Sequence, residues 1–377
     1  MAFDLTAEQQ ALREEAATIA AEEIRPVASD LDAAGEHPTD VLETLGERGF
    51  GGLTVAEEHG GLGADLVGLT AVVEELSAAM MPVASALALH LGVAAVVERF
   101  GSDALRDEVL PELARFDTVA ALGLSEENAG SDKRGLETTA ERDGDEWVLD
   151  GHKRWVTNFF HADTVLTYAK TGPDAEAPHN VSAFLVPTDA FEVEHVWDTL
   201  GARSVKSPKV TLRSVRVPDA ARVGPVGEAS VQRGRVHTGV NVPARAVGIA
   251  RAAVEDAVEH VSTREQFGHP IGDFQGVRWR VAEMAASVDE ARLLTRRAAA
   301  VADAGEDPTR AFAAAKVRAT ETAVDVTNEA LQLHGGIGYT TERDVERYLR
   351  DARLLTIAGG PNEGHRDALA DAVFEAG

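Results

Sequence analysis

The sequence contains no cysteine, and this absence excludes several kinds of chemistry at once. Disulfides, Fe–S clusters, cysteine-ligated zinc and a catalytic thiol all require that side chain. The common signatures for phosphate, metal or nucleophile sites are also missing: there is no GxGxxG after a predicted strand, no P-loop, no HExxH and no GxSxG. The 12 histidines are scattered, without a pair at metal-ligand spacing. We therefore expect no metal site.

Positive charge is scarce. The chain has 36 basic against 63 acidic residues, a formal net charge of −27, and only 6 of the basic residues are lysine. Such a surface repels nucleic-acid backbones and anionic membranes, so binding to either is not expected. An acidic, lysine-poor and alanine-rich composition is typical of a halophilic protein, whose charges are screened by concentrated salt. GC-rich codon usage favours the same residues, and composition alone leaves both explanations open.

Long apolar runs are also lacking. The stretch Ala78–Val97 comes nearest to the roughly 18 residues that suggest a membrane span, but it carries Ser85 and His90. The first residues lack the basic and apolar regions of a signal peptide. We expect no membrane insertion and a cytoplasmic location. At 377 residues the chain exceeds the roughly 250–300 that one hydrophobic core supports, so it should divide into domains.

The pattern along the chain predicts helices, then strands, then helices. Residues 1–117 show helical periodicity, and Thr6 and Gln9 have capping-box spacing. Residues 118–226 contain short runs rich in β-branched and large apolar residues, such as Val165–Tyr168 and Ala183–Val186, which predict a small barrel or sandwich. Residues 227–377 return to helical spacing. The expected fold class is α+β, with three domains at these boundaries.

Two segments of the predicted β-domain carry candidate binding residues. The first, Ala121–Asp132, is an apolar strand that leads into a loop with Ser125 and Ser131. The second, Trp147–Asn158, contains Asp150-Gly151, which predicts the turn of a hairpin. Beyond that turn, Trp155 and Thr157 alternate onto one face, so an aromatic ring and a hydroxyl can contact one ligand. Trp155 as an ordinary core residue is an equal alternative from these residues alone.

Two segments of the C-terminal region complete the set. Arg264–Gln275 ends one predicted helix and starts the next, and Arg264, Phe267 and Gln275 have no evident packing reason to occur together. Gln332–Tyr339 contains Gly335-Gly336 at the end of another predicted helix. Paired glycines there usually form only a C-cap, but they also let backbone N–H groups approach a pyrophosphate. The motifs Arg350–Arg353 and Gly359–Glu363 follow.

In this order and spacing, the segments resemble the acyl-CoA dehydrogenase family over nearly the whole chain. The opening Phe3–Gln10 and the loop Gly51–Gly63 also match, with Ala56 where proline is usual. The resemblance implies a helical N-terminal domain, a central β-barrel, a C-terminal four-helix bundle, bound FAD and a homotetramer. It also implies α,β-dehydrogenation of an acyl-CoA thioester, with electrons passed to an electron-transfer flavoprotein.

The resemblance also assigns expected roles to individual residues. Leu124 and Ser125 would line the flavin ring, Trp155 would pack on it and Thr157 would bond near its N5 atom. Ser131 would contact the CoA chain. The remaining cofactor contacts would come from the C-terminal region, where three residues hold the adenosine diphosphate of a neighbouring subunit's FAD and three contact FAD from the other side: Arg264, Phe267 and Gln275, then Gln332, Gly335 and Gly336.

The chain departs from the family where the reaction needs a general base. Most members carry a glutamate after the Arg-Asp-Ala-Arg motif, and alignment on Arg350–Arg353 places Gly359 at that position. A minority carry the base on the helix before the Arg264 motif, where this chain has Thr238. Both remain expected substrate contacts, because the backbone N–H of Gly359 can still polarise the thioester carbonyl. Glu363 is a weak candidate for the base.

Three explanations of this departure stay open. A carboxylate elsewhere in the chain could act as the base. The chain could be a catalytically degenerate flavoprotein subunit in a mixed tetramer with a base-bearing paralogue. It could also use the flavin without removing an α-proton, as oxidase-like and hydroxylase-like relatives do.

Overall fold

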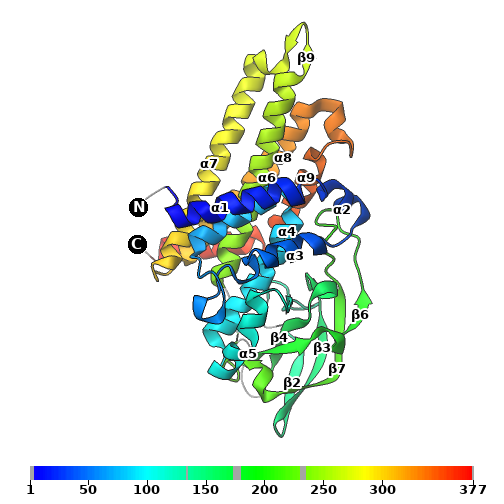
Figure 1. The fold of residues 1–377 in the computed structure, drawn as a ribbon, viewed down its shortest axis with the longest axis vertical. Coiled ribbons are helices and arrows are strands. Elements are labelled where there is room, and N and C mark those ends of the chain that lie inside the picture. The colour runs from blue at the N-terminus through cyan, green and yellow to red at the C-terminus, as the bar shows by residue number, and fades with distance from the viewer. Residues whose placement is uncertain (1–3, 133–134, 173–179, 230–234, 376–377) are drawn as a thin grey trace.

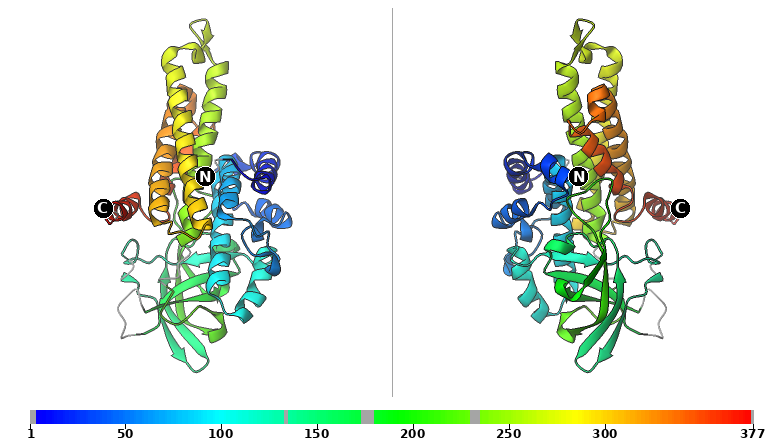
Figure 2. Two further views of the ribbon diagram at one scale, coloured as in Figure 1. Left: turned by 90° about the vertical axis from the view of Figure 1, so that its left-hand side faces the viewer. Right: turned by 90° about the vertical axis from the view of Figure 1, so that its right-hand side faces the viewer.

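The computed structural model describes residues 4–132, 135–172, 180–229 and 235–375. Helices from both ends of the chain pack together, and the β-domain formed by its middle part lies at one end of them (Figure 1). Two views at right angles show that the C-terminal helices project from the N-terminal helices on the side opposite the sheet (Figure 2). The α+β order predicted from the sequence is therefore confirmed.

The N-terminal region is helical, as expected. Thr6 caps the first helix through a capping box, in which its side chain accepts from the Gln9 N–H and the Gln9 side chain accepts in return. The helix continues as one π-helical turn over Ala20–Ile24. The helices of this region are α1 (Ala7–Ile19), α2 (Ala28–Ala34), α3 (Thr39–Glu47), α4 (Leu66–Phe100) and α5 (Asp103–Ala114).

The longest of these helices, α4, is the central element of the core. It runs through a kink at Met80, whose backbone is extended, and Pro82 follows two residues later. A proline ring within a helix removes one backbone hydrogen bond, which accounts for the kink. By length and composition α4 could cross a membrane, but 83% of its most apolar window is buried inside the protein. We conclude that α4 is a core helix.

The β-domain is one eight-stranded sheet, in the order β6-β7-β3-β2-β4-β5-β8, with β1 paired to β4. In the described part of the chain, β6 and β8 are the edge strands of this order. Two apolar clusters hold it, one beneath α4 and α5 and one between the strands around Trp147 and Phe184. The strands are β1 (Ala120–Gly123), β2 (Thr139–Asp143), β3 (Glu146–Lys153), β4 (Thr164–Lys170), β5 (Val181–Pro187), β6 (Glu192–His195), β7 (Lys209–Pro218) and β8 (Arg222–Val223).

The hairpin turn predicted at Asp150-Gly151 is wrong. Strand β3 runs straight through this dipeptide, and its register with β7 shifts between Leu149 and Gly151, which marks a β-bulge. Gly151 has a φ of +146°, and a Cβ there would lie 2.6 Å from the Thr138 Cα. The Asp150 carboxylate accepts from the Ser214 N–H of β7 at 2.8 Å, so it stabilises the bulge. The turn between β2 and β3 lies instead at Gly144.

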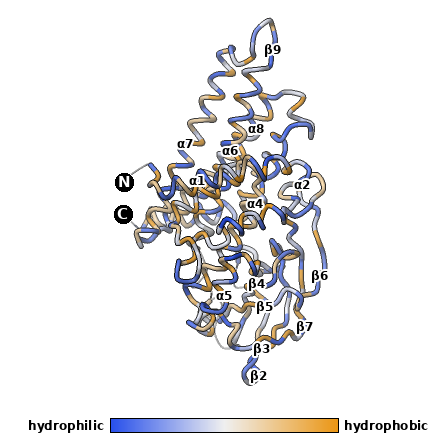
Figure 3. Tube along the Cα trace, in the orientation of Figure 1, coloured by the Kyte–Doolittle hydropathy of each residue, from blue (hydrophilic) through white to orange (hydrophobic). Residues whose placement is uncertain are grey.

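The C-terminal helices form a bundle that continues the N-terminal core. Helices α6 (Arg235–Thr263), α7 (Gln275–Asp303), α8 (Thr309–His334) and α9 (Val345–Leu355) pack together, α4 lies along α6, and α10 (Asn362–Phe374) packs on α8. A small hairpin of β9 (Glu265–Gln266) and β10 (His269–Pro270) joins α6 to α7. Hydrophilic and hydrophobic residues are mixed along the outer helices α1 and α7 (Figure 3), as expected for helices with one exposed face.

His90, fully buried on α4, makes the stability of this core depend on pH. Its Nε2 lies 3.0 Å from the Leu113 carbonyl and its Nδ1 accepts from the Ala120 N–H, so both ring nitrogens are used by the neutral ring. Burial lowers the pKa of His90 to about 4. His90 is therefore protonated below about pH 6.5 in the unfolded chain but only near pH 4 in the folded chain. The free energy of unfolding is highest above pH 6.5 and falls as the pH drops towards 4.

We predict that His90→Gln reduces this acid sensitivity. Between pH 7 and pH 5 the unmodified protein should lose about 2 kcal/mol more unfolding free energy than the variant, at 1.36 kcal/mol per pKa unit. Denaturant titrations at both pH values measure the difference. His195→Gln, at an exposed position on β6, is the control and should not alter the pH dependence. Equal losses in His90→Gln and the unmodified protein would contradict the prediction.

Candidate functional site

The first group of predicted site residues meets at one edge of the β-domain. The segment after β1 and the end of β3 lie side by side, because the Arg154 N–H donates to the Ser125 carbonyl at 2.7 Å. This contact places Ser125 beside Trp155. The Trp155 side chain is half exposed, its φ is +60°, and its ring stacks on Trp197 at 4.1 Å between centroids. The alternative of Trp155 as a core residue is therefore excluded.

Trp155 and Thr157 both come after the end of β3, so they do not share a strand face as expected; instead they lie in a tight turn in which the Thr157 N–H donates to the Trp155 carbonyl at 3.1 Å. Val156 between them is fully buried, whereas Trp155 is half exposed and Thr157 is partly exposed. The Thr157 hydroxyl lies 2.9 Å from the Ser207 hydroxyl. An exposed aromatic face with hydroxyls beside it suits a planar cofactor, which requires stacking and hydrogen bonds to its edge. The residues present thus fit a flavin ring.

A buried ion pair holds this edge together. The Lys153 ammonium on β3 lies 2.5 Å from the Glu126 carboxylate, and both side chains are fully buried. Lys153 also donates to the Tyr168 carbonyl, and Glu126 accepts from the Thr138 N–H. Burial opposes ionisation of Glu126, but Lys153 and these donors outweigh it and lower the pKa of the carboxyl. The pair fixes the loop of Leu124 and Ser125 against the end of β3, two residues before Trp155.

The second group lies at the far end of the bundle, away from the sheet (Figure 1). Arg264 follows the end of α6, Gln275 begins α7, and Phe267 sits at the tip of the β9–β10 hairpin with 90% of its side chain exposed. Phe267 has a φ of +57°, which the tight turn of the hairpin imposes on it. Within the described ranges no carboxylate forms an ion pair with Arg264. These side chains are therefore available to another molecule.

Gln332, Gly335 and Gly336 join this second group at the end of α8. The helix ends at His334, and Gly335 forms its cap. The His334 ring stacks on His260 of α6 at 4.4 Å, only four residues before Arg264, so the two helix ends meet. Exposed apolar side chains surround them, among them Ile337 and Tyr339. One chain thus presents its ten predicted cofactor residues in two separate groups.

The third group surrounds the loop that carries Gly359. This glycine has a φ of +69°, and its carbonyl lies 3.0 Å from the His365 ring. Beneath the loop, the buried Lys316 of α8 donates to the Gly360 carbonyl at 2.7 Å and to the Asn362 side chain at 2.8 Å. Burial lowers the pKa of Lys316 to about 8. A buried cation therefore supports the loop where the family usually carries its base.

The other predicted substrate and base residues are less constrained. Ser131 is exposed in the loop after β1. Thr238 belongs to the first turn of α6, and its side chain lies outside the described part of the chain. Glu363 lies at the start of α10, is largely exposed, and has Arg366 as its ion-pair partner at 3.8 Å. Its carboxylate lines a pocket of about 420 Å³ on the outer side of the loop, between α8 and α10.

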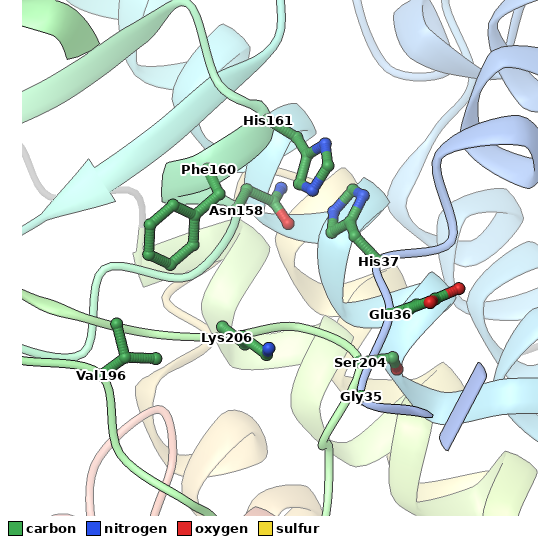
Figure 4. A pocket seen from close by; sticks show the side chains of 9 residues that line it. All are labelled: Gly35, Glu36, His37, Asn158, Phe160, His161, Val196, Ser204 and Lys206. Atoms are coloured by element: carbon green, nitrogen blue, oxygen red, sulfur yellow. The ribbon is translucent and has the colours of Figure 1, made fainter. Parts of the chain in front are cut away.

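A larger pocket, of about 620 Å³, opens between the N-terminal helices and the β-domain. The His37 and His161 rings stack across it at 3.6 Å, and burial together with repulsion from His161 lowers the pKa of His37 to about 4 (Figure 4). The pocket adjoins the first group, because two lining residues are the chain neighbours of Thr157 and Ser207. Its lining is Gly35, Glu36, His37, Asn158, Phe160, His161, Val196, Ser204 and Lys206.

Comparison with protein families gives three matches in one order. The acyl-CoA dehydrogenase N-terminal, middle and C-terminal domains match residues 6–117, 121–215 and 229–374. The chain belongs to the acyl-CoA dehydrogenase family. It is therefore an oxidoreductase, and the resemblance seen in the sequence is confirmed.

Individual relatives cover the chain from end to end. A probable acyl-CoA dehydrogenase of Bacillus subtilis, YngJ, is 37% identical over 98% of this chain and 99% of its own. The structure of butyryl-CoA dehydrogenase from Megasphaera elsdenii is 30% identical, covers 99% and 100% of the two chains, and has a TM-score of 0.96.

Two further structures bear on the cofactor and the partner. One, described as the electron transferring flavoprotein of Acidaminococcus fermentans, is 32% identical over 99% of both chains, with a TM-score of 0.96. The other, an FAD complex of PigA, is 26% identical over 100% of both chains, with a TM-score of 0.94.

Sequence reasoning missed three residues that build the site. Glu126 and Lys153 lie inside the segments that were singled out, but nothing in their spacing shows that they pair. Trp197 lies in an irregular segment after β6, far from Trp155 along the chain. Lysine is so rare in this sequence that Lys153 and Lys316, two of only six, could have been suspected of a buried role.

We predict that Lys153→Met destabilises the protein by about 3–5 kcal/mol, because it leaves the Glu126 carboxylate buried without a counter-charge. The double variant Lys153→Met with Glu126→Leu should recover most of this loss, since no uncompensated charge then remains. Denaturant titration measures both. If the double variant were as unstable as Lys153→Met alone, the cost would lie in packing and the ion-pair argument would be wrong.

Proposed function

We propose that the protein catalyses the FAD-dependent α,β-dehydrogenation of an acyl-CoA thioester. Membership of the acyl-CoA dehydrogenase family supports the reaction class and the FAD cofactor. The observation that carries the proposal is the edge of the β-domain, where the exposed face of Trp155 lies beside Ser125 and Thr157. FAD, when bound, would accept the two electrons that the reaction removes from the substrate.

The chain's own residues have three tasks in this reaction. Trp155 stacks against the flavin ring, and the Ser125 and Thr157 hydroxyls bond to its edge. Leu124 contacts the ring from the same loop, and Ser131 contacts the CoA chain. The backbone N–H of Gly359 donates to the thioester carbonyl, which acidifies the α-carbon. The Lys316 ammonium holds the loop of Gly359 in place for this role.

Removal of the α-proton is the weak step, because Gly359 and Thr238 offer no carboxylate. Loss of a general base typically slows a reaction by about 10²–10⁴-fold. Glu363 is the nearest carboxylate along the chain, but it is exposed and faces Arg366. The second candidate function follows from this observation: a catalytically degenerate flavoprotein subunit that pairs with a base-bearing paralogue. An oxidase-like or hydroxylase-like use of the flavin, without α-deprotonation, is the third.

The separation of the cofactor residues supports an oligomer. Arg264 follows the end of α6 at the tip of the bundle, whereas Trp155 follows β3 in the β-domain, so we infer that Arg264, Phe267 and Gln275 bind the adenosine diphosphate of FAD held by a neighbouring subunit (Figure 1). Gln332, Gly335 and Gly336 contact FAD from the other side. We propose a homotetramer or a mixed tetramer, an electron-transfer flavoprotein as acceptor, and a cytoplasmic location. The acidic composition suits a halophilic host.

We predict that the purified protein is yellow and that Trp155→Ala releases FAD more readily. The variant loses the stacking face, and ring stacking contributes about 0.5–1.5 kcal/mol beyond area burial, so FAD should bind roughly 3- to 10-fold more weakly. Dialysis followed by flavin fluorescence measures the retained cofactor. Phe374→Ala removes an exposed aromatic residue on α10 and should retain FAD normally. A colourless protein that takes up no added FAD would contradict the cofactor assignment.

We predict that anaerobic butyryl-CoA bleaches the flavin slowly or not at all, and that Gly359→Asp speeds bleaching. Asp and Asn tolerate the positive φ of this position better than Glu does. Gly359→Asn is thus a control of equal shape without a base. Flavin bleaching should be about 10²-fold faster in Gly359→Asp than in Gly359→Asn. Stopped-flow absorbance records the rates. Fast bleaching by the unmodified protein would show that a carboxylate elsewhere acts as the base.

A further inference from the structure

Arg245 is a buried cation that has no carboxylate partner among the residues that the structure describes. It lies in the middle of α6, and only 6% of the residue is exposed. Its guanidinium donates to the Ser85 hydroxyl of α4 at 2.7 Å and to the Asn241 side-chain oxygen at 3.0 Å, while its Nε has no partner. Both acceptors are neutral. Burial without a counter-charge lowers the pKa of Arg245 to about 10.

Three other arginines of the helical core in the described ranges have carboxylate partners. Arg347 pairs with Asp344 at 3.0 Å and Arg350 with Asp32 at 2.6 Å. Arg251, six residues after Arg245 on the same helix, pairs with Glu75 at 2.6 Å. Arg245 alone among these four has no carboxylate within ion-pair distance in those ranges. A buried unpaired charge is costly, so its retention calls for an anion that binds there.

The position of Arg245 connects it to the reaction centre. It lies seven residues after Thr238, two helical turns along α6, and Asn241 lies between them on the same face. Arg245 is also close enough to Lys316 for its charge to contribute to the lowered pKa of that amine, and Lys316 holds the loop of Gly359. Arg245 therefore lies on the helix that carries one usual base position, and its charge reaches the lysine that supports the loop of the other. Two buried cations at this place create a positive interior.

We propose that the acyl group of the substrate carries a carboxylate, and that this carboxylate pairs with Arg245. The inference rests on the proposed function, since it places an acyl-CoA between α4, α6 and the Gly359 loop. An arginine fork suits a carboxylate, because two parallel N–H donors match its two oxygens. The Ser85 hydroxyl and the Asn241 side chain hold the two terminal nitrogens of the guanidinium, and its buried Nε has no partner. The preferred substrate class is thus the thioester of a dicarboxylic acid.

The test compares two thioesters that each have a five-carbon acyl chain, glutaryl-CoA with a terminal carboxylate and pentanoyl-CoA without one. Each is titrated into the FAD-loaded protein, and calorimetry gives the dissociation constant. The unmodified protein should bind glutaryl-CoA at least about 10-fold more tightly than pentanoyl-CoA. Arg245→Met has a similar stem without the charge, and it should lose this preference while binding pentanoyl-CoA as well or better. Arg245→Lys should keep part of the preference.

Arg251→Met is the matched control, because it removes a paired arginine from the same helix and should leave the preference unchanged. Equal affinity of the unmodified protein for both thioesters, or an unchanged preference in Arg245→Met, would overturn the proposal and leave Arg245 as a bridge between α4 and α6. If Arg245→Met does not fold, Arg245→Lys and the unmodified protein decide the question. Failure to bind either thioester would instead reject the proposed function.

Discussion

The candidate site depends on the buried pair of Lys153 and Glu126. The cofactor-facing residues come from two segments, the loop after β1 and the end of β3, which this pair holds together along with the backbone hydrogen bond from Arg154 to Ser125. A salt bridge in the interior tolerates little displacement, because each ion without its partner would be a buried charge. The pair therefore sets the distance between Ser125 and Trp155. In a chain with an excess of carboxylates, most acidic groups are solvated, and this one is bound in the core.

Helix α6 links the three parts of the site. It begins near Thr238, passes Arg245 in the core, and ends at Arg264 on the outer tip of the bundle. Its length separates the flavin-facing edge of the sheet from the residues expected to hold the adenosine diphosphate, which is why we propose that a neighbouring subunit supplies the latter. The buried stretch of the same helix supplies the positive charge that we connect with the acyl group.

Much of this organisation could be predicted from residues alone. The capping box at Thr6, the helical periodicity and the short apolar strands are local features, and local features determine where elements begin and what type they are. The bulge at Asp150-Gly151 could not be predicted from the sequence, because this dipeptide forms a turn only when no neighbouring strand pairs with it. Strand β7 supplies the Ser214 N–H for Asp150, and pairing with β7 converts the expected turn into a bulge.

The sequence by itself determined the family, the cofactor class and the absence of a carboxylate at Gly359 and Thr238, because these depend on residue identity and order. Only the tertiary structure decided which charges have partners. Glu126 meets Lys153, and Trp155 meets Trp197, because packing of the sheet brings segments far apart in the chain together. Packing of α4 against α6 buries Arg245 where the described part of the chain offers it no carboxylate. Whether a buried charge has a counter-charge depends on which side chains surround it in the folded protein, so no pattern in the sequence could reveal it.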